Sequence, residues 1–170
     1  MIIRDMAAEA ALTSGERIGS SFPSVHDHFG TIPNHYITLY QSSPFQQYLT
    51  TGGEGYAQLE LYRRAHQIFS NIPYVRSFIL FFEGEQTVLT QHGVYDIDDF
   101  FRQYYQNTQY SATFWEKERF SQFTQRYYPE ETFAQTTFPG WTYVDLMPIA
   151  MKPYWGHKYM LLLLVDIGAV

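Results

Sequence analysis

The sequence contains no cysteine, few lysines and no long apolar run. The absence of cysteine excludes disulfides and thiolate metal sites. Only three lysines occur in a chain of net charge −6, which argues against a surface for nucleic-acid phosphates. The apolar run from Tyr159 to Ile167 is too short to span a bilayer, which takes about 20 residues. The first residues, Met1 to Asp5, lack the basic and apolar regions of a signal peptide.

The composition is that of one folded domain. A chain of 170 residues with 45% apolar and 19% aromatic residues can bury a sizeable core. We therefore treat residues 1–170 as a single domain, with a helical segment at 1–45 and a mixed core at 46–170. The apolar run near the C-terminus stops at Gly168-Ala169-Val170 with no helix to cover it. We accordingly expect the chain to be a domain excised from a longer protein.

Apolar residues spaced alternately by four and three predict a long N-terminal helix. Pro23 and Pro33 interrupt this stripe, so we expect a kink or a break near one of them. The helix should pack partly on a sheet, and its free part should offer a dimer contact. The stripe consists of Ile18, Phe22, Val25, Phe29, Ile32, Tyr36 and Leu39.

Two shorter helices should follow. Ser42-Ser43-Pro44 is typical of a helix start, with a capping serine and a proline in the first turn, and this helix should reach Leu49. The glycine-rich loop at 51–55 lacks the Lys-Ser/Thr pair of a phosphate-binding loop. The next helix should run from about Tyr56 to Asn71, with one apolar face formed by Leu59, Tyr62, Ala65 or His66, and Phe69.

The apolar period then changes from that of a helix to that of a strand. Strands are expected at 75–82 and 87–90, joined by a hairpin turn at 83–86 and followed by a short edge segment at 93–95. Asp96 or Asp98 should cap a helix that reaches about Tyr105. The remaining pattern predicts a helix at 114–127, and strands at 132–137, at 142–149 (closing near Pro148) and at 159–167. The fold class is therefore α+β, with an antiparallel sheet covered on one face by the long helix.

This order of elements resembles the extracellular Cache sensor domains, which are PAS-like modules of bacterial transmembrane receptors. The resemblance covers roughly residues 15–170 and is closest to the sensors of membrane-bound AraC-type transcription regulators of Paenibacillus-like firmicutes. The segments on which it rests are the stripe from Ile18 to Leu39, Tyr74–Phe82, Gly93 with Asp99-Phe100-Phe101, Phe114-Trp115, Val144–Ile149 and Leu162–Ile167.

The resemblance implies a PAS-like antiparallel sheet with a long N-terminal helix and further covering helices, the Cache fold. It implies a ligand-binding sensor on the extracellular face of the cell membrane, anchored by flanking segments outside this chain. A homodimer through the N-terminal helix is a further implication. The absence of cysteine fits an extracellular domain of a Gram-positive bacterium. No nucleic acid should bind through this domain.

The candidate ligand site combines aromatic rings with a few polar groups, as saccharides require. Each of these rings could equally belong to the core, and Asp145 could equally face solvent. The site should lie between the sheet face bearing Tyr143 and Asp145 and the segment from Tyr104 to Trp115. In the family, amino-acid sensors use an Arg-x-Trp-Tyr pattern, whereas Ala112 stands at the arginine position here, which favours a saccharide or neutral polyol. The candidate residues are Tyr104, Tyr105, Trp115, Tyr143, Asp145, Tyr154 and Trp155.

Neither a metal site, a cofactor nor catalysis is expected. His28 and His35 are seven residues apart, with no third ligand at a suitable spacing. No nucleophile elbow or zinc-protease motif occurs. The main alternative to a sensor is a structural or protein-interaction domain without a small ligand, and an enzyme is the third. A cavity with Asp145 or Trp115 facing in would favour the sensor, and a closed core filled with rings would favour the interaction domain.

Overall fold

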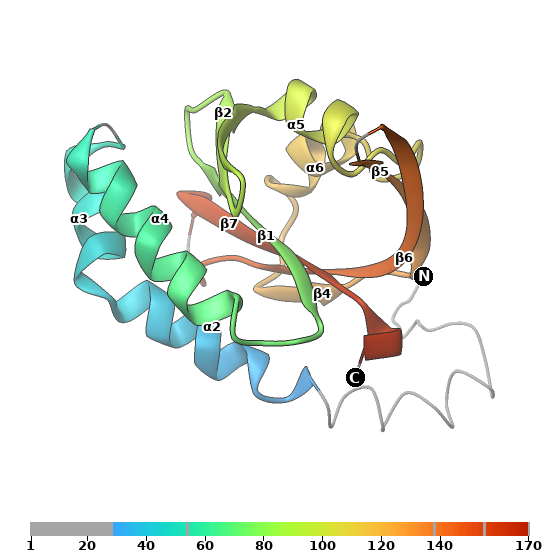
Figure 1. Ribbon diagram of the computed structural model, residues 1–170. Coiled ribbons are helices and arrows are strands. Elements are labelled where there is room, and N and C mark those ends of the chain that lie inside the picture. Colours follow the sequence, from blue (N-terminus) through green and yellow to red (C-terminus); the bar gives the residue numbers. More distant parts are fainter. Residues whose placement is uncertain (1–28, 54, 138, 155, 170) are drawn as a thin grey trace.

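The computed structural model describes residues 29–53, 55–137, 139–154 and 156–169 (Figure 1). The predicted stripe at residues 18–28, His28 and Trp155 lie outside the described residues. The described part is a mixed α+β domain with five α-helices, a seven-stranded antiparallel sheet and a final 3-10 turn at Ile167–Ala169. The elements are α2 (Ile32–Gln41), α3 (Ser43–Thr51), α4 (Tyr56–Phe69), β1 (Val75–Phe82), β2 (Thr87–Thr90), β3 (Gly93–Asp96), α5 (Ile97–Gln103), α6 (Ala112–Glu118), β4 (Gln125–Tyr127), β5 (Glu131–Thr137), β6 (Gly140–Met151) and β7 (Tyr159–Val165).

The first and last strands of the domain pair at the centre of the sheet. The strand order is β3-β2-β1-β7-β6-β4, with β5 also paired to β6, and every pairing is antiparallel. In the central pair, Ile79 lies opposite Leu162 and Leu80 opposite Leu161. All seven residues of β7 are buried. A strand covered on both faces needs apolar side chains at successive positions, which explains the continuous apolar runs of β1 and β7.

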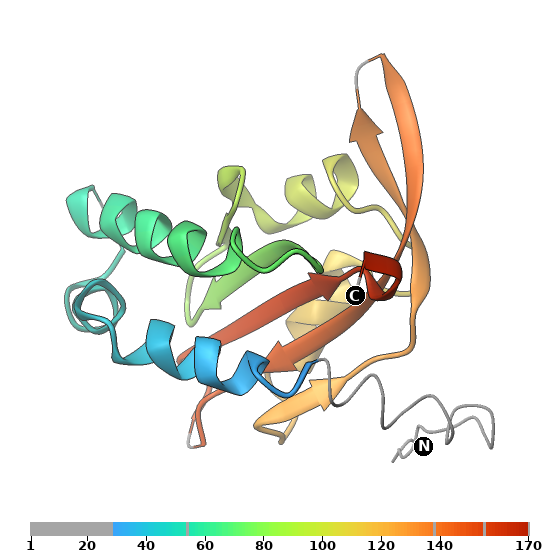
Figure 2. The same ribbon diagram turned by 60° about the horizontal axis from the view of Figure 1, so that its bottom comes forward.

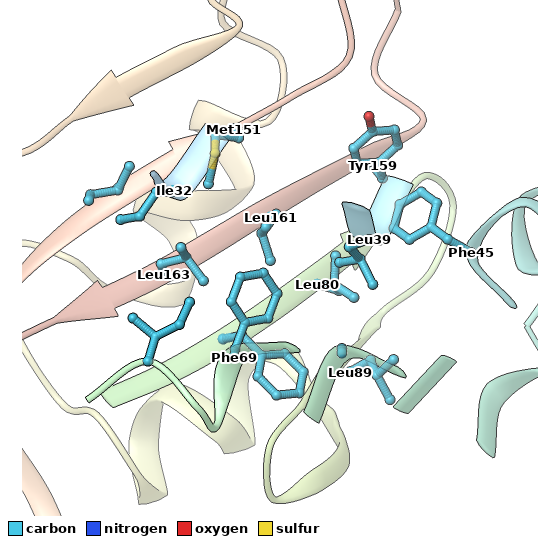
Figure 3. Close-up of a cluster of buried hydrophobic side chains, with 14 of the residues drawn as sticks. Ile32, Leu39, Phe45, Phe69, Leu80, Leu89, Met151, Tyr159, Leu161 and Leu163 are labelled. Atoms are coloured by element: carbon cyan, nitrogen blue, oxygen red, sulfur yellow. The ribbon is translucent and has the colours of Figure 1, made fainter. Parts of the chain in front are cut away.

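Helices cover both faces of this sheet (Figure 1). Helices α2, α3 and α4 pack on one face, where Ile32, Leu39 and Phe69 meet Leu80 and Leu161 (Figure 3). Helices α5 and α6 pack on the other, where alternate strand residues form a second core. That core includes Ile79, Phe81, Phe100, Phe101, Trp115, Leu162 and Leu164. The two-residue period of a strand thus separates β1 and β7 into two cores.

The described part of the N-terminal stripe lies against the sheet. Phe29, Ile32 and Leu39 are fully buried and Tyr36 packs on the same core. A single continuous helix through residue 39 is wrong, because α2 begins at Ile32 after a turn at residues 30–31. Pro33 stands in the first turn of α2, where a missing N–H costs nothing. The expected break near one of the two prolines is therefore confirmed.

Two predicted helix starts are confirmed by their caps. The Ser42 hydroxyl accepts a hydrogen bond from the Phe45 N–H at 3.4 Å, and Pro44 lies in the first turn of α3. Asp96, rather than Asp98, caps α5 by accepting from the Asp99 N–H at 3.1 Å. Each side chain satisfies a backbone donor that the first helical turn leaves without a partner.

The predicted apolar face of α4 was partly wrong. The helix buries Leu61, Ala65 and Phe69, whereas Leu59 is 43% exposed. Both sets of residues have helical spacing, so the sequence offers two overlapping stripes. The stripe that begins at Leu61 faces the sheet, and packing alone makes that choice.

The helix predicted at 114–127 was also wrong. Helix α6 ends at Glu118, and residues 125–127 form β4, which pairs with the end of β6. The buried ammonium of Lys152 donates to the carbonyls of Glu118, Arg119 and Ser121. These are the carbonyls that a continuing helix would use for its own hydrogen bonds. A side chain distant in sequence therefore ends the helix.

The alternating pattern predicted that the strand would end near Pro148, and this was wrong. Strand β6 continues to Met151, and the Pro148 carbonyl accepts from the Tyr128 N–H at 2.9 Å. The N–H and C=O of one strand residue point to the same side, so the missing donor faces β4 and β5. At this point the partner of β6 changes from β5, paired to Leu146, to β4, paired from Ile149. The proline therefore interrupts no ladder there.

Replacing Gly53 by Ala should destabilise the fold by about 1–2 kcal/mol, because an added methyl overpacks a filled site. A Cβ at Gly53 would lie 1.8 Å from the ring of Tyr48, which is buried and donates to Glu85. Chemical denaturation measures the change. Gly140→Ala is the matched control, since nothing lies within 4 Å of its added Cβ. Equal stabilities of the two variants would contradict the packing of Tyr48 on Gly53.

Candidate functional site

An open groove lies between helices α5 and α6 and the hairpin formed by β5 and β6. Its volume is about 730 Å³. Phe101, Ala112 and Ala134 provide apolar surface, and Tyr143 adds an exposed ring. Polar side chains complete the wall, among them Asp98, Arg102, Gln106, Thr108, Thr113 and Thr132. The groove therefore combines a ring with several hydrogen-bonding groups.

The hairpin wall follows from strand register. Thr132 lies opposite Asp145 and Ala134 opposite Tyr143, so these four side chains share one face of the hairpin. The distal part of the hairpin projects from the body of the domain (Figure 2). The Thr132 hydroxyl donates to the Asp145 carboxylate at 2.6 Å. The Tyr143 ring is 74% exposed, so it can stack on a ligand.

The opposite wall is the segment between α5 and α6, which is fixed to the free edge of β5. Gln106 and Ala134 form a β-bridge, and the Asn107 amide donates to the Thr132 carbonyl at 2.9 Å. The Asn107 side-chain oxygen also accepts from the N–H groups of Gln109 and Tyr110 at 2.8 Å. The side chain of Asn107 thus fixes the conformation of the loop and is not available to a ligand. The side chain of Gln106, by contrast, makes no hydrogen bond within the described residues.

Among the sequence candidates that the structure describes, Tyr143 alone lines the groove. Asp145 lies on the same face but is exposed and bonded to Thr132, so it does not face into a cavity. Tyr104 stacks on His92 at 4.4 Å and shares a hydrogen bond with Tyr95, away from the groove. Tyr154 is 76% exposed in the connection between β6 and β7.

Tyr105 and Trp115, the two other candidates, are fully buried in the second core. The Trp115 ring stacks on Tyr110 at 5.5 Å and meets Tyr128 edge-on at 5.0 Å. Tyr110 in turn stacks on Phe133 at 5.9 Å. The space between the sheet and helices α5 and α6 is thus filled by packed rings. By the criterion set above, this filling favours an interaction domain over an internal ligand pocket.

Three polar atoms in this core lack a hydrogen-bond partner within the described residues. They are the Tyr105 and Ser77 hydroxyls and the Trp115 Nε1. Burial raises the pKa of Tyr105, and the neighbouring Ser77 hydroxyl partly offsets this, but no donor–acceptor geometry links the two oxygens. A buried polar group without a partner costs about 1–3 kcal/mol. The second core therefore contains buried polar groups whose hydrogen-bonding capacity is unused.

The buried charges at the end of α6 have structural partners. Arg119 donates to the Phe82 carbonyl and to Glu116, both at 2.7 Å, and Lys152 holds the carbonyls that follow α6. Burial lowers the pKa of Lys152 to about 8. The Glu118 carboxylate accepts from Tyr128 at 2.5 Å and Arg126 at 3.0 Å. This cluster fastens α6 to the sheet, and none of its residues lines the groove beside Tyr143.

Sequence reasoning missed the polar residues of the groove. Asp98, Arg102 and Gln106 look like ordinary helix-surface and loop residues, and no motif marks them. The prediction did name the segment from Tyr104 to Trp115 as one wall, and that segment contains Gln106 and Thr108. Within the described residues, no three His, Cys, Asp or Glu side chains gather to hold a metal ion. In the same part of the chain, no helix has the length and apolarity needed to cross a membrane.

Tyr105→Phe should leave the free energy of unfolding unchanged or raise it slightly, because the hydroxyl it removes has no partner. Tyr128→Phe is the matched comparison in the same core. It should cost about 1–2 kcal/mol, since its hydroxyl donates to Glu118. Urea titration of both variants measures the difference. If Tyr105→Phe lowered the free energy of unfolding as much as Tyr128→Phe, the Tyr105 hydroxyl would have a hydrogen-bond partner after all.

Comparison with known proteins assigns no family. No protein-family model matches the chain, and no curated protein sequence matches it. The resemblance to Cache domains therefore remains an expectation drawn from the sequence. The function must be argued from the groove, the two cores and the order of the strands.

Proposed function

We propose that this domain is the ligand-binding sensor module of a membrane-anchored signalling protein, with a Cache-type, PAS-like fold. The arrangement of the elements supports the proposal: three helices are followed by the antiparallel strands β1, β2 and β3, two more helices come next, and the last strand, β7, returns to pair with β1. The module would stand on the extracellular face of the membrane, joined to an output domain by flanking segments. It would bind its ligand without converting it.

The groove beside Tyr143 is the observation that carries the proposal. It lies between the hairpin face bearing Tyr143 and a part of the segment from Tyr104 to Trp115, of which Gln106, Thr108 and Ala112 line it. Saccharides offer apolar C–H faces for the ring and hydroxyls for side chains such as Gln106 and Thr108. Ala112 lines the groove at the position where amino-acid sensors of this family carry an arginine. A neutral saccharide or polyol is therefore the favoured ligand.

The proposed mechanism is a shift between two conformations of the hairpin and α6. Both elements line the groove, and β6 continues from the hairpin into the centre of the sheet beside β7. Strand β7 ends at Val165, and the next residue, Asp166, accepts from Arg76 at 2.8 Å at the start of β1. A ligand that favours one position of the hairpin would thus change the position of the segment that follows β7. The shift in this conformational equilibrium cannot exceed the difference in the ligand's binding free energy for the two conformations.

A thermal-shift screen with mono- and disaccharides, sugar alcohols and amino acids tests the proposal. A ligand at 100 times its Kd adds about 2.7 kcal/mol of stability, which a melting curve resolves. Tyr143→Ala should weaken binding of the saccharide found by about tenfold or more, because it removes the stacking ring. Tyr154→Ala removes an equally exposed ring outside the groove and should leave the affinity for the saccharide unchanged. Equal binding by both variants would place the site elsewhere.

The ring-filled second core favours one other function, a protein-interaction domain without a small ligand. In that case the aromatic residues of α5 and α6 serve packing alone. The exposed side chains of Trp141 and Tyr143 on the projecting hairpin would then meet a partner protein. If no sugar, polyol or amino acid shifts the melting temperature while the protein stays folded, this second function replaces the sensor.

A further inference from the structure

A second groove lies between the first half of α4 and the hairpin of β2 and β3. Its volume is about 290 Å³. Gln58, Leu59 and Tyr62 form the helix wall, and Leu89 and Val94 form the strand wall. The Tyr62 hydroxyl donates to the Gln91 carbonyl at 3.0 Å, which fixes the distance between the two walls. This hydrogen bond between α4 and the β2–β3 turn therefore fixes the width of the groove.

Exposed apolar residues gather at this groove. Leu59 is 43% exposed and Val94 is 40% exposed, and Tyr56, at the start of the same helix, is 72% exposed. Every residue that lines the groove is uncharged. A charged side chain entering it would lose water without gaining a partner. The groove accordingly suits an uncharged, apolar side chain.

The strand wall is also an edge of the sheet. Strand β3 is last in the strand order, so one side of its backbone has no strand partner within the described residues. Its single charged residue, Asp96, is occupied in capping α5. The opposite edge is protected, because β4 has three residues, carries Arg126 in an ion pair with Glu118, and is soon followed by Pro129. Natural proteins commonly protect an edge with a charge or a proline, whereas β3 has no proline and a single charge at its last residue.

We propose that β3 and the groove beside it bind a short extended segment of a partner protein, which adds one strand to the sheet. The backbone of the segment pairs with residues 93–96, and its alternate side chains enter the groove, because a strand directs every second side chain to one face. The segment is therefore uncharged and apolar at alternate positions.

The groove alone is too small to be the interface of a stable dimer. Seven residues line it, whereas such an interface takes about 20–30 residues from each partner. A strand of a few residues matches both the four-residue length of β3 and the small volume of the groove. The proposal is independent of ligand binding at the Tyr143 groove, which lies against other elements.

The probe is a random library of twelve-residue peptides displayed on phage, selected against the full chain. Selected sequences are synthesised with a fluorescent label and titrated by anisotropy. The expected result is a set of peptides with alternating apolar residues, bound at least tenfold more weakly by Leu59→Asp and by Val94→Lys. Both side chains are partly exposed, so the variants should fold, and circular dichroism checks this.

Ile37→Asp is the matched control, since Ile37 is 46% exposed on α2, outside the groove. It should bind the selected peptides as the unchanged protein does. Three results would overturn the proposal: no enriched peptide, equal binding by both groove variants, or an equal loss with Ile37→Asp. A mass near twice 20.0 kDa in light scattering, lost in Leu59→Asp, would also overturn it by making a second copy the occupant.

Discussion

The pairing of β1 with β7 is the constraint on which the rest of this domain depends. The two strands are far apart in the sequence, yet they form the longest register in the centre of the sheet, from Val75 opposite Val165 to Phe82 opposite Tyr159. Both faces of the pair are buried, so each face requires its own layer of helices. The chain before β1 supplies one layer, and the chain between β3 and β4 supplies the other.

The two layers differ in a way that matters for function. The layer of α2, α3 and α4 also buries tyrosines, but their hydroxyls have partners: Tyr48 donates to Glu85, and Tyr159 shares a hydrogen bond with Tyr36. The layer of α5 and α6 packs tyrosines and a tryptophan and leaves the Tyr105 hydroxyl and Trp115 Nε1 without partners. Ligand sites are commonly found where packing is less complete and polar groups converge. The Tyr143 groove borders this second layer, which supports its choice as the proposed ligand site.

Much of the fold was predictable because it is encoded locally. Short-range signals marked the caps at Ser42 and Asp96, the hairpin after Phe82 and the apolar run of β7, and the structure confirms each of them. The candidate site was predicted less well. Rings such as Trp115 and Tyr105 have the same composition whether they fill a core or line a pocket, so sequence could not distinguish these roles. The polar residues of the groove carry no motif.

The sequence by itself determined the α+β class, the antiparallel strands and the presence of a large aromatic core, because these follow from apolar period, turn residues and composition. Tertiary structure decided which stripe of α4 faces the sheet, where α6 ends and how far β6 extends past Pro148. Each of these outcomes depends on a contact between distant segments, such as Lys152 with the carbonyls after α6. A local pattern cannot contain such a contact, because its energy exists only once the sheet has brought the two segments together.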